Sequence, residues 1–187
     1  MNSKILIAGE GGQGVQTIAK ILIKAAYDSG KKVGYLPNFG VEQRGGVSLA
    51  YIQISDSEIV FPKFDKADFA IILARRAVKR IEKNITQKTK IMFDNSILKE
   101  SELSDFRVEK IAIPASRMAK EKLIPRVFNT IILGALAEEL GFINEKDLKK
   151  SLLDHIAPKI KERHEIKHFN LAGLDLGRKT IRDISGR

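Results

Sequence analysis

The sequence has 187 residues, 43% of them apolar, which is enough for one domain with a substantial core. It contains no cysteine, which excludes disulfides, a thiol nucleophile and cysteine-ligated iron–sulfur clusters within the chain. The 33 lysines and arginines outnumber the 23 aspartates and glutamates, and the net charge of +10 favours an anionic partner. The lysines are scattered and form no basic arm, which argues against nucleic acid as that partner.

The first stretch, from Lys4 to Ile23, predicts a strand, a glycine turn and a helix, which together form the first half of a βαβ unit. Residues 5–8 are an apolar run bounded by glycine, as in a strand buried on both faces. Glycines at positions 9, 11, 12 and 14 then allow a tight turn and a close approach of backbone. Apolar residues recur at helical spacing from Val15 to Ala26 and form one stripe. The amides at the start of this helix could hold an anion.

Gly9, Gly11 and Gly14 fit the pattern G-x-G-x-x-G of dinucleotide-binding proteins. Such a site normally has an acidic residue at the end of the second strand, about 20 residues further on, to bind a ribose hydroxyl. The second strand, expected near Lys32 to Leu36, runs instead into Pro-Asn-Phe without a carboxylate. We therefore do not favour a classical NAD site, and the glycines could simply pack the helix on the strand. A free-standing NAD(P)- or FAD-binding dehydrogenase remains the alternative.

A second glycine-rich stretch, N-F-G-V-E-Q-R-G-G, spans residues 38–46 and carries Arg44. A guanidinium on such a loop suits bidentate binding of a phosphate or carboxylate, and an equally good interpretation is a local pair with Glu42. Alternating apolar residues from Val47 to Ser55 predict a strand. A turn at 55–57 followed by Glu58 to Phe61 predicts that this strand returns as a β-hairpin.

Further buried strands are predicted over 67–74, 90–93 and 108–113, with a basic helix over 76–84. Strands separated by helical stretches indicate right-handed crossovers and a mostly parallel sheet of a Rossmann-like α/β fold. The loops at 9–14, 38–46, 74–76, 94–96 and 114–116 then share the edge where such sheets bind ligands. Polar residues there, including Arg75 and Arg76, are the better site candidates.

The C-terminal third is expected to be helical. Pro125 suits the start and Gly141 the end of an apolar helix that must be buried on several sides. Asn144 can cap the next helix, which we expect Pro158 to break. A last helix or arm follows, so we expect a single domain with an α/β core over 1–160 and a helical arm over 161–187.

Residues 164–168, H-E-I-K-H, match the zinc-binding pattern H-E-x-x-H. No third histidine follows, and only Asp175 and Asp183 could replace it. Little chain remains to build a substrate cleft. We therefore interpret these residues as a solvated helix face and expect no metal site on this chain.

Residues 1–4 lead directly into the first predicted strand without a signal peptide, and no run of about 18 apolar residues is present. The sequence therefore predicts a cytoplasmic protein that does not enter a membrane.

The motifs G-E-G-G-Q-G-V-Q-T-I-A-K-I-L at 9–22 and G-V-E-Q-R-G-G at 40–46 resemble the gamma subunit of 2-oxoacid:ferredoxin (acceptor) oxidoreductases. The resemblance continues with D-N-S at 94–96, F-N-T-I-I-L-G-A-L at 128–136 and N-L-A-G-L-D-L-G at 170–177. It departs from the family at Val41, where proline is common, and at the unusually basic pair Arg75-Arg76.

The resemblance implies a subunit of a complex that oxidatively decarboxylates a 2-oxoacid to an acyl-CoA. In that family thiamine diphosphate lies between other subunits, and cysteines that this chain lacks ligate the iron–sulfur clusters. The implied partners are the alpha and beta subunits, with or without a delta subunit, and a ferredoxin-type acceptor. The chain itself would have no catalytic residue and no tightly bound cofactor, but would shape one wall of the coenzyme A site. The implied contacts are at Gly11, Gly12, Gln13, Gly14, Arg44, Gly45 and Gly46.

Overall fold

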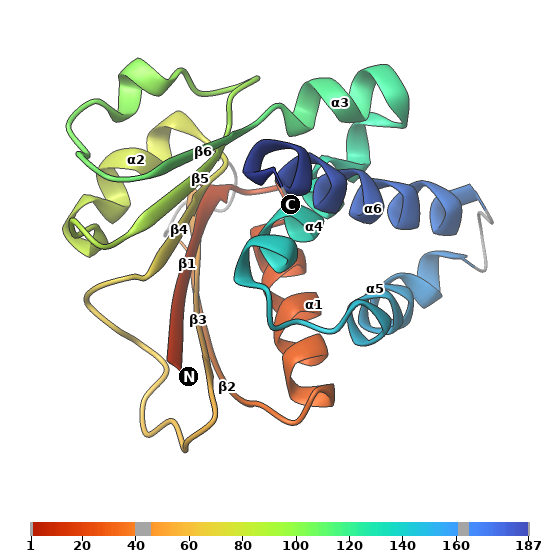
Figure 1. Ribbon diagram of the computed structural model, residues 1–187, viewed down its shortest axis with the longest axis horizontal. Coiled ribbons are helices and arrows are strands. Elements are labelled where there is room, and N and C mark those ends of the chain that lie inside the picture. Colours follow the sequence, from red (N-terminus) through yellow and green to blue (C-terminus); the bar gives the residue numbers. More distant parts are fainter. Residues whose placement is uncertain (1, 40–45, 161–164, 187) are drawn as a thin grey trace.

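The computed structural model describes residues 2–39, 46–160 and 165–186 (Figure 1). Its centre is a six-stranded sheet in the order β2-β3-β1-β4-β5-β6. β3 runs antiparallel to both of its neighbours, and the other strands all run in one direction, so the predicted mostly parallel sheet is confirmed. The strands are β1 (Asn2–Glu10), β2 (Lys32–Phe39), β3 (Val47–Ser55), β4 (Phe69–Ile72), β5 (Lys90–Asp94) and β6 (Lys110–Ile113).

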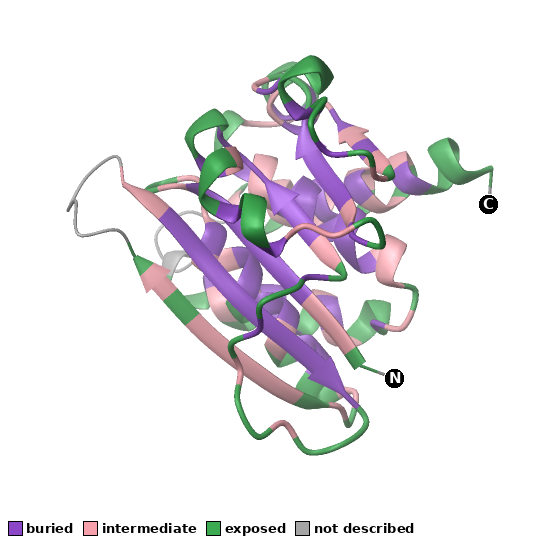
Figure 2. Cartoon of the chain, turned by 90° about the vertical axis from the view of Figure 1, so that its left-hand side faces the viewer, coloured by how far each residue is buried: buried purple, intermediate pink, exposed green. Residues whose placement is uncertain are grey.

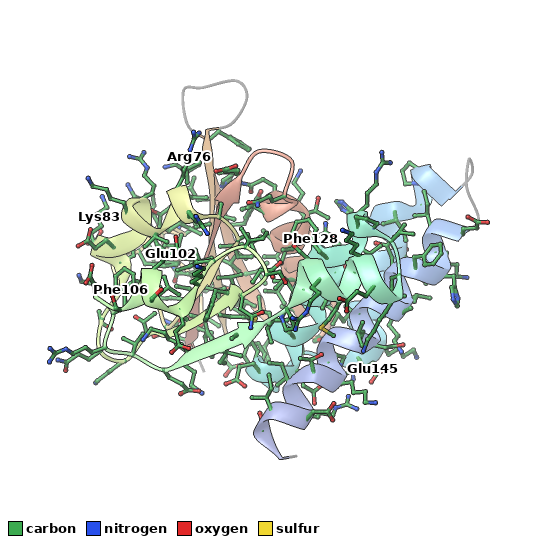
Figure 3. All side chains as sticks on the ribbon, turned by 90° about the horizontal axis from the view of Figure 1, so that it is seen from above. Arg76, Lys83, Glu102, Phe106, Phe128 and Glu145 are labelled. Carbon is green, nitrogen blue, oxygen red and sulfur yellow. The ribbon has the colours of Figure 1, made fainter. Side chains whose placement is uncertain are left out.

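Helices cover both faces of the sheet (Figure 1). One face carries α1 (Val15–Asp28), α4 (Phe128–Leu140), α5 (Glu145–Ile160) and α6 (Glu165–Ser185). The other carries α2 (Arg75–Ile81) with the short helices η1 (Glu82–Asn84) and η2 (Glu100–Leu103). From β6 the chain passes through α3 (Ala115–Lys122) and η3 (Pro125–Val127) into α4. Figure 3 shows Arg76, Lys83, Glu102 and Phe106 on the α2 side, with Phe128 and Glu145 on the other.

Each face of the sheet has its own apolar core. Ile5 and Ile7 of β1 belong to the core beneath α1 and α4, whereas Leu6 and Ala8 belong to the core on the α2 side. Successive side chains of a strand point to opposite faces, so a strand covered by helices on both sides must be apolar throughout. This explains why the first strand reads as an uninterrupted apolar run.

The predicted hairpin between residues 47–55 and 58–61 is wrong. β3 pairs with β2 on one side and with β1 on the other, so both of its hydrogen-bonding edges are occupied. No edge is left for a returning strand, and residues 56–68 form an irregular connection instead. Gln53 of β3 still holds this connection, because its side-chain amide donates to the carbonyl of Phe61 at 2.8 Å.

The predicted end of α4 and the predicted cap of α5 are confirmed, whereas the start of α4 and the end of α5 differ from the prediction. Pro125 begins the short helix η3, and α4 itself runs from Phe128 to Leu140 with Gly141 as its C-cap. Asn144 caps α5 by accepting a hydrogen bond from the amide of Lys146 at 2.8 Å. Pro158, however, lies inside α5, which continues to Ile160. Proline removes one intrahelical hydrogen bond. Only two helical residues follow it, so the loss stays confined to the last turn.

The last helix packs closely on α4 through glycine. A Cβ added at Gly134 of α4 would collide with the backbone carbonyl of Leu174, and one at Gly177 of α6 would collide with the carbonyl of Ile131. A Cβ at Gly173 would lie 2.8 Å from Oγ1 of Thr130. The two helix backbones therefore touch, and α6 contributes buried residues to the same core as α1.

Candidate functional site

The two glycine-rich stretches meet at one edge of the sheet. Glu10 at the end of β1 is paired with Val47 at the start of β3, and Phe39 at the end of β2 is paired with Ser48. The amide of Gly11 donates to the carbonyl of Gly46 at 3.3 Å. Two motifs far apart in the sequence are thus in direct contact, at the edge where α/β sheets bind ligands.

The turn after β1 requires glycine at two positions. Gly12 has φ 97° and Gly14 has φ 81°, a left-handed conformation that side chains with a Cβ rarely adopt. The amide of Gln13 donates to the carbonyl of Glu10 at 3.1 Å and closes the turn. The expectation that these glycines shape the backbone is therefore confirmed.

Gln13 holds this turn through both ends of its side chain. Its Oε1 accepts a hydrogen bond from the amide of Glu10 at 2.7 Å. Its Nε2 donates to the carbonyl of Leu73, which follows β4, at 2.9 Å. The half-buried amide thus ties the turn to the neighbouring strand, which fixes where the glycine backbone lies along the edge.

Gln16 is a positioning residue that sequence analysis missed. Its Nε2 donates to Ser48 Oγ and to the carbonyl of Leu49, both at 2.9 Å, and its Oε1 accepts from the hydroxyl of Tyr35 at 2.6 Å. It links the first turn of α1 to β3 and β2, the two strands that flank residues 40–45. One feature of the sequence could have indicated this role: Gln16 follows Gln13 at the start of a helix whose inner face is otherwise apolar.

Arg44 and Gly45, together with Val41 and Glu42, lie outside the described residues. The alternatives for Arg44, a ligand contact or a pair with Glu42, therefore stay predictions. Gly46 is described, half-buried and bonded to Gly11. The root of the second glycine loop is thus fixed against the first.

A cavity of about 490 Å³ lies beside the first glycine turn, where the start of α1 meets η3, the end of α5 and the start of α6. Gly14 borders this region, since a Cβ there would lie 2.5 Å from Asn129 Nδ2. The lining combines polar groups with apolar walls. It consists of Thr17, Ile124, Pro125, Arg126, Val127, Asn129, His155, Ile156, Ile166 and Asn170. Such a mixture suits an elongated ligand with both polar and apolar parts.

Arg75 and Arg76 lie at the predicted edge, and both have contacts within the chain. Arg75 Nε lies 3.1 Å from Glu102 Oε1 and donates to the carbonyl of Ile97 at 3.3 Å. Arg76 Nε lies 3.9 Å from the carboxylate of Glu10 in the glycine turn. Both side chains are exposed, so these pairs are weak and leave the guanidinium groups accessible from solvent.

The D-N-S motif has a structural role at the same edge. Asp94 is fully buried, and its carboxylate accepts hydrogen bonds from the amide of Ser96 and from both the amide and the hydroxyl of Ser116. These bonds join the end of β5 to the first turn of α3 and satisfy the carboxylate within the protein. Asp94 therefore has no free oxygen aimed at a ligand.

Of the H-E-x-x-H match, His164 lies outside the described residues, and Glu165 begins α6. His168 packs edge-on against Phe169 with ring centroids 5.8 Å apart. Across the described ranges, no group of three histidine, aspartate or glutamate side chains is placed to hold a metal ion. The described helices also include none with the length and apolar character needed to span a bilayer.

A family model described as pyruvate ferredoxin/flavodoxin oxidoreductase matches residues 4–180. The 2-oxoglutarate synthase subunit KorC of Methanothermobacter thermautotrophicus is 31% identical over 99% of this chain and 98% of its own length. A solved 2-oxoglutarate:ferredoxin oxidoreductase from Magnetococcus marinus, with 2-oxoglutarate, coenzyme A and succinyl-CoA bound, has a TM-score of 0.84 and 26% identity. It matches 97% of this chain and 31% of the longer one. A keto/oxoacid ferredoxin oxidoreductase gamma subunit from Geobacter sulfurreducens shares the fold, with a TM-score of 0.79, 21% identity and coverage of 96% and 98%.

Proposed function

The chain belongs to the pyruvate ferredoxin/flavodoxin oxidoreductase family, and we propose that it serves as the gamma subunit of a complex that oxidatively decarboxylates a 2-oxoacid to an acyl-CoA. It is a subunit of a 2-oxoacid:ferredoxin oxidoreductase.

The observation that supports this contribution most is the contact between the two glycine stretches, from Gly11 to Gly46. The first stretch runs into the start of α1, where helix amides favour an anion. The second carries Arg44, whose guanidinium can bind phosphate with two parallel hydrogen bonds. Coenzyme A carries phosphates at one end and an amide-containing arm that suits the mixed cavity beside Gly14. We therefore assign one wall of the coenzyme A site to this edge, with contacts at residues 11–14 and 44–46.

The redox chemistry belongs to other subunits in this proposal. A chain without cysteine cannot supply thiolates to an iron–sulfur cluster. We propose that thiamine diphosphate and the clusters lie on or between the alpha and beta subunits, with or without a delta subunit, and that electrons leave to a ferredoxin-type acceptor. This chain shapes the complex and holds no catalytic acid, base or nucleophile.

The alternative of a free-standing NAD(P)- or FAD-dependent dehydrogenase has no support. β2 ends at Asn38 and Phe39, so no carboxylate stands at the position that normally binds the adenosine ribose. The family match covers nearly the whole chain and describes a different oxidoreductase.

The test compares the isolated chain with the complete complex. The isolated chain should be colourless and should not reduce a viologen dye with a 2-oxoacid and coenzyme A. The complex purified through a tag on this chain should do so only when coenzyme A is present. Iron-dependent absorbance in the pure chain, or turnover without other subunits, would overturn the proposal.

A further inference from the structure

Two large apolar side chains are exposed to solvent at the edge of the sheet opposite to the glycine turns. Val60 is 99% exposed and Phe61 is 63% exposed. They belong to the connection between β3 and β4, which crosses the face of the molecule as a mostly exposed segment in Figure 2. We call Val60 and Phe61 the apolar knob.

The backbone beneath the apolar knob is held firmly in place. Gln53 Nε2 donates to the carbonyl of Phe61 at 2.8 Å, which pins the segment to β3. On either side of the knob, Ile59 and Pro62 pack against β2, where a Cβ added to Gly34 would lie 3.1 and 3.2 Å from them. An apolar pair on an ordered backbone loses little conformational entropy when it enters a pocket, and this favours binding.

Charged side chains of both signs line the hollow beside the apolar knob: Lys4, Lys63 and Lys66 are opposed by Glu58 and Asp65, which leaves a small basic excess. Glu58 forms an ion pair with Lys32 at 2.9 Å, which neutralises it. Lys63 and Lys66 form no ion pair with any of the described residues, and both are exposed. Lys66 Nζ donates to the carbonyl of Lys83, so this contact orients the ammonium group without cancelling its charge. A basic excess beside exposed apolar side chains fits a partner with an apolar pocket and an acidic rim.

We propose that the apolar knob docks this chain into such a pocket on another subunit of the oxidoreductase; this inference rests on the proposed function. A second copy of this chain is a poor partner, because the lysines around one knob would lie against those around the other. The net charge of +10 adds to this repulsion. In the Magnetococcus marinus enzyme the matching fold makes up 31% of a longer chain, so other parts of that enzyme share its polypeptide. The knob also lies at the far edge from the glycine turns, and docking there leaves the proposed coenzyme A wall open.

Cysteine labelling tests the docking directly, because the natural chain has no thiol. Val60→Cys places one thiol in the knob, and Ile184→Cys, at a site that is 57% exposed near the end of α6, is the matched control. Each variant is labelled with a maleimide, alone and within the purified complex, and mass spectrometry of this chain gives the rate. The position 60 thiol should react at least tenfold more slowly in the complex, whereas the position 184 thiol should react at the same rate in both.

A second measurement gives the contribution to affinity. The remaining subunits, prepared from cells that lack this chain, are titrated with purified wild-type chain and with the double variant Val60→Ser, Phe61→Ser. The double variant should bind at least tenfold more weakly with an unchanged melting temperature, since truncating exposed side chains does not disturb the fold. Lys63→Glu should slow association and weaken its dependence on salt.

Equal labelling of position 60 in the free chain and the complex, or equal binding of the double variant, would overturn the knob proposal while leaving the gamma-subunit role intact. Protection of position 60 in the isolated chain at rising concentration would assign the knob to self-association and would also overturn it. A wild-type chain that does not bind the remaining subunits would instead refute the proposed function.

Discussion

Replacing Gly177 by alanine tests the close contact between α4 and α6, because two physical effects predict opposite signs. Alanine is about 1 kcal/mol better than glycine inside a helix, so helix propensity alone predicts stabilisation. The added methyl group would collide with the carbonyl of Ile131 and would lie 2.9 Å from the amide nitrogen of Ala135. Both are backbone atoms that cannot rotate away, so the helices must separate.

Overpacking of a core costs about 1–3 kcal/mol, and a clash with backbone belongs at the upper end of that range. Subtracting the gain in propensity leaves a net loss of about 2 kcal/mol. For a chain of this length the melting temperature should fall by about 4–8 °C. Lys179→Ala, at an exposed position of the same helix, should change it by less than about 2 °C. Calorimetry of both variants is the assay. A higher melting temperature for Gly177→Ala would show that the two backbones do not touch.

Further substitutions probe the glycine turns, the start of α1 and the ion pairs between α4 and α6. Gly14→Val should cost about 2–4 kcal/mol of stability, measured by urea unfolding, because φ is 81° and Asn129 lies against this position; an unchanged midpoint would refute the contact. Gln16→Met should lower stability by about 1–3 kcal/mol, since Tyr35 and Ser48 lose a half-buried hydrogen-bond partner, and Gln16→Glu should not restore it. Hydrogen bonds from Arg182 and Arg178 hold the pKa of Glu138 at about 2, below its ordinary 4.5, so stability should be lost as pH falls from about 4.5 towards 2. Glu138→Gln should flatten that part of a melting-temperature profile. Arg44→Lys should keep the melting temperature but weaken coenzyme A binding or assembly by about 1–3 kcal/mol; a lowered melting temperature with normal assembly would assign Arg44 to the fold.

The parts of the fold that depend on local signals could be predicted from the sequence. The run from Ile5 to Ala8, the glycines and the stripe of α1 lie within one continuous stretch, and each of these elements is confirmed. The C-terminal end of α4 and the cap of α5 at Asn144 could likewise be predicted, because caps are short-range features. The shared edge of the two glycine motifs followed from strand direction.

What sequence analysis missed depends on contacts between distant segments. The alternation of apolar residues in β3 predicts a strand but does not say which strand pairs with it. β1 occupies the edge of β3 that the prediction gave to residues 58–61. In the sequence, Gln16 looks like an ordinary helical residue. Its role follows only from its hydrogen bonds to Ser48 of β3 and Tyr35 of β2. From the sequence, the motifs at 128–136 and 170–177 could be identified only by their resemblance to the family. The structure explains why these motifs contain glycine. Gly134 belongs to one motif and Gly177 to the other, and both lie where α4 and α6 touch.

We propose that this chain works as the gamma subunit of a 2-oxoacid oxidoreductase. The most direct measurement is viologen reduction by the complex purified through a tag on this chain, with coenzyme A titrated against a fixed 2-oxoacid concentration. We expect the alpha and beta subunits to co-purify and the rate to depend on coenzyme A, with no rate from the chain alone. A chain that purifies without partners and reduces NAD(P) or FAD by itself would contradict it.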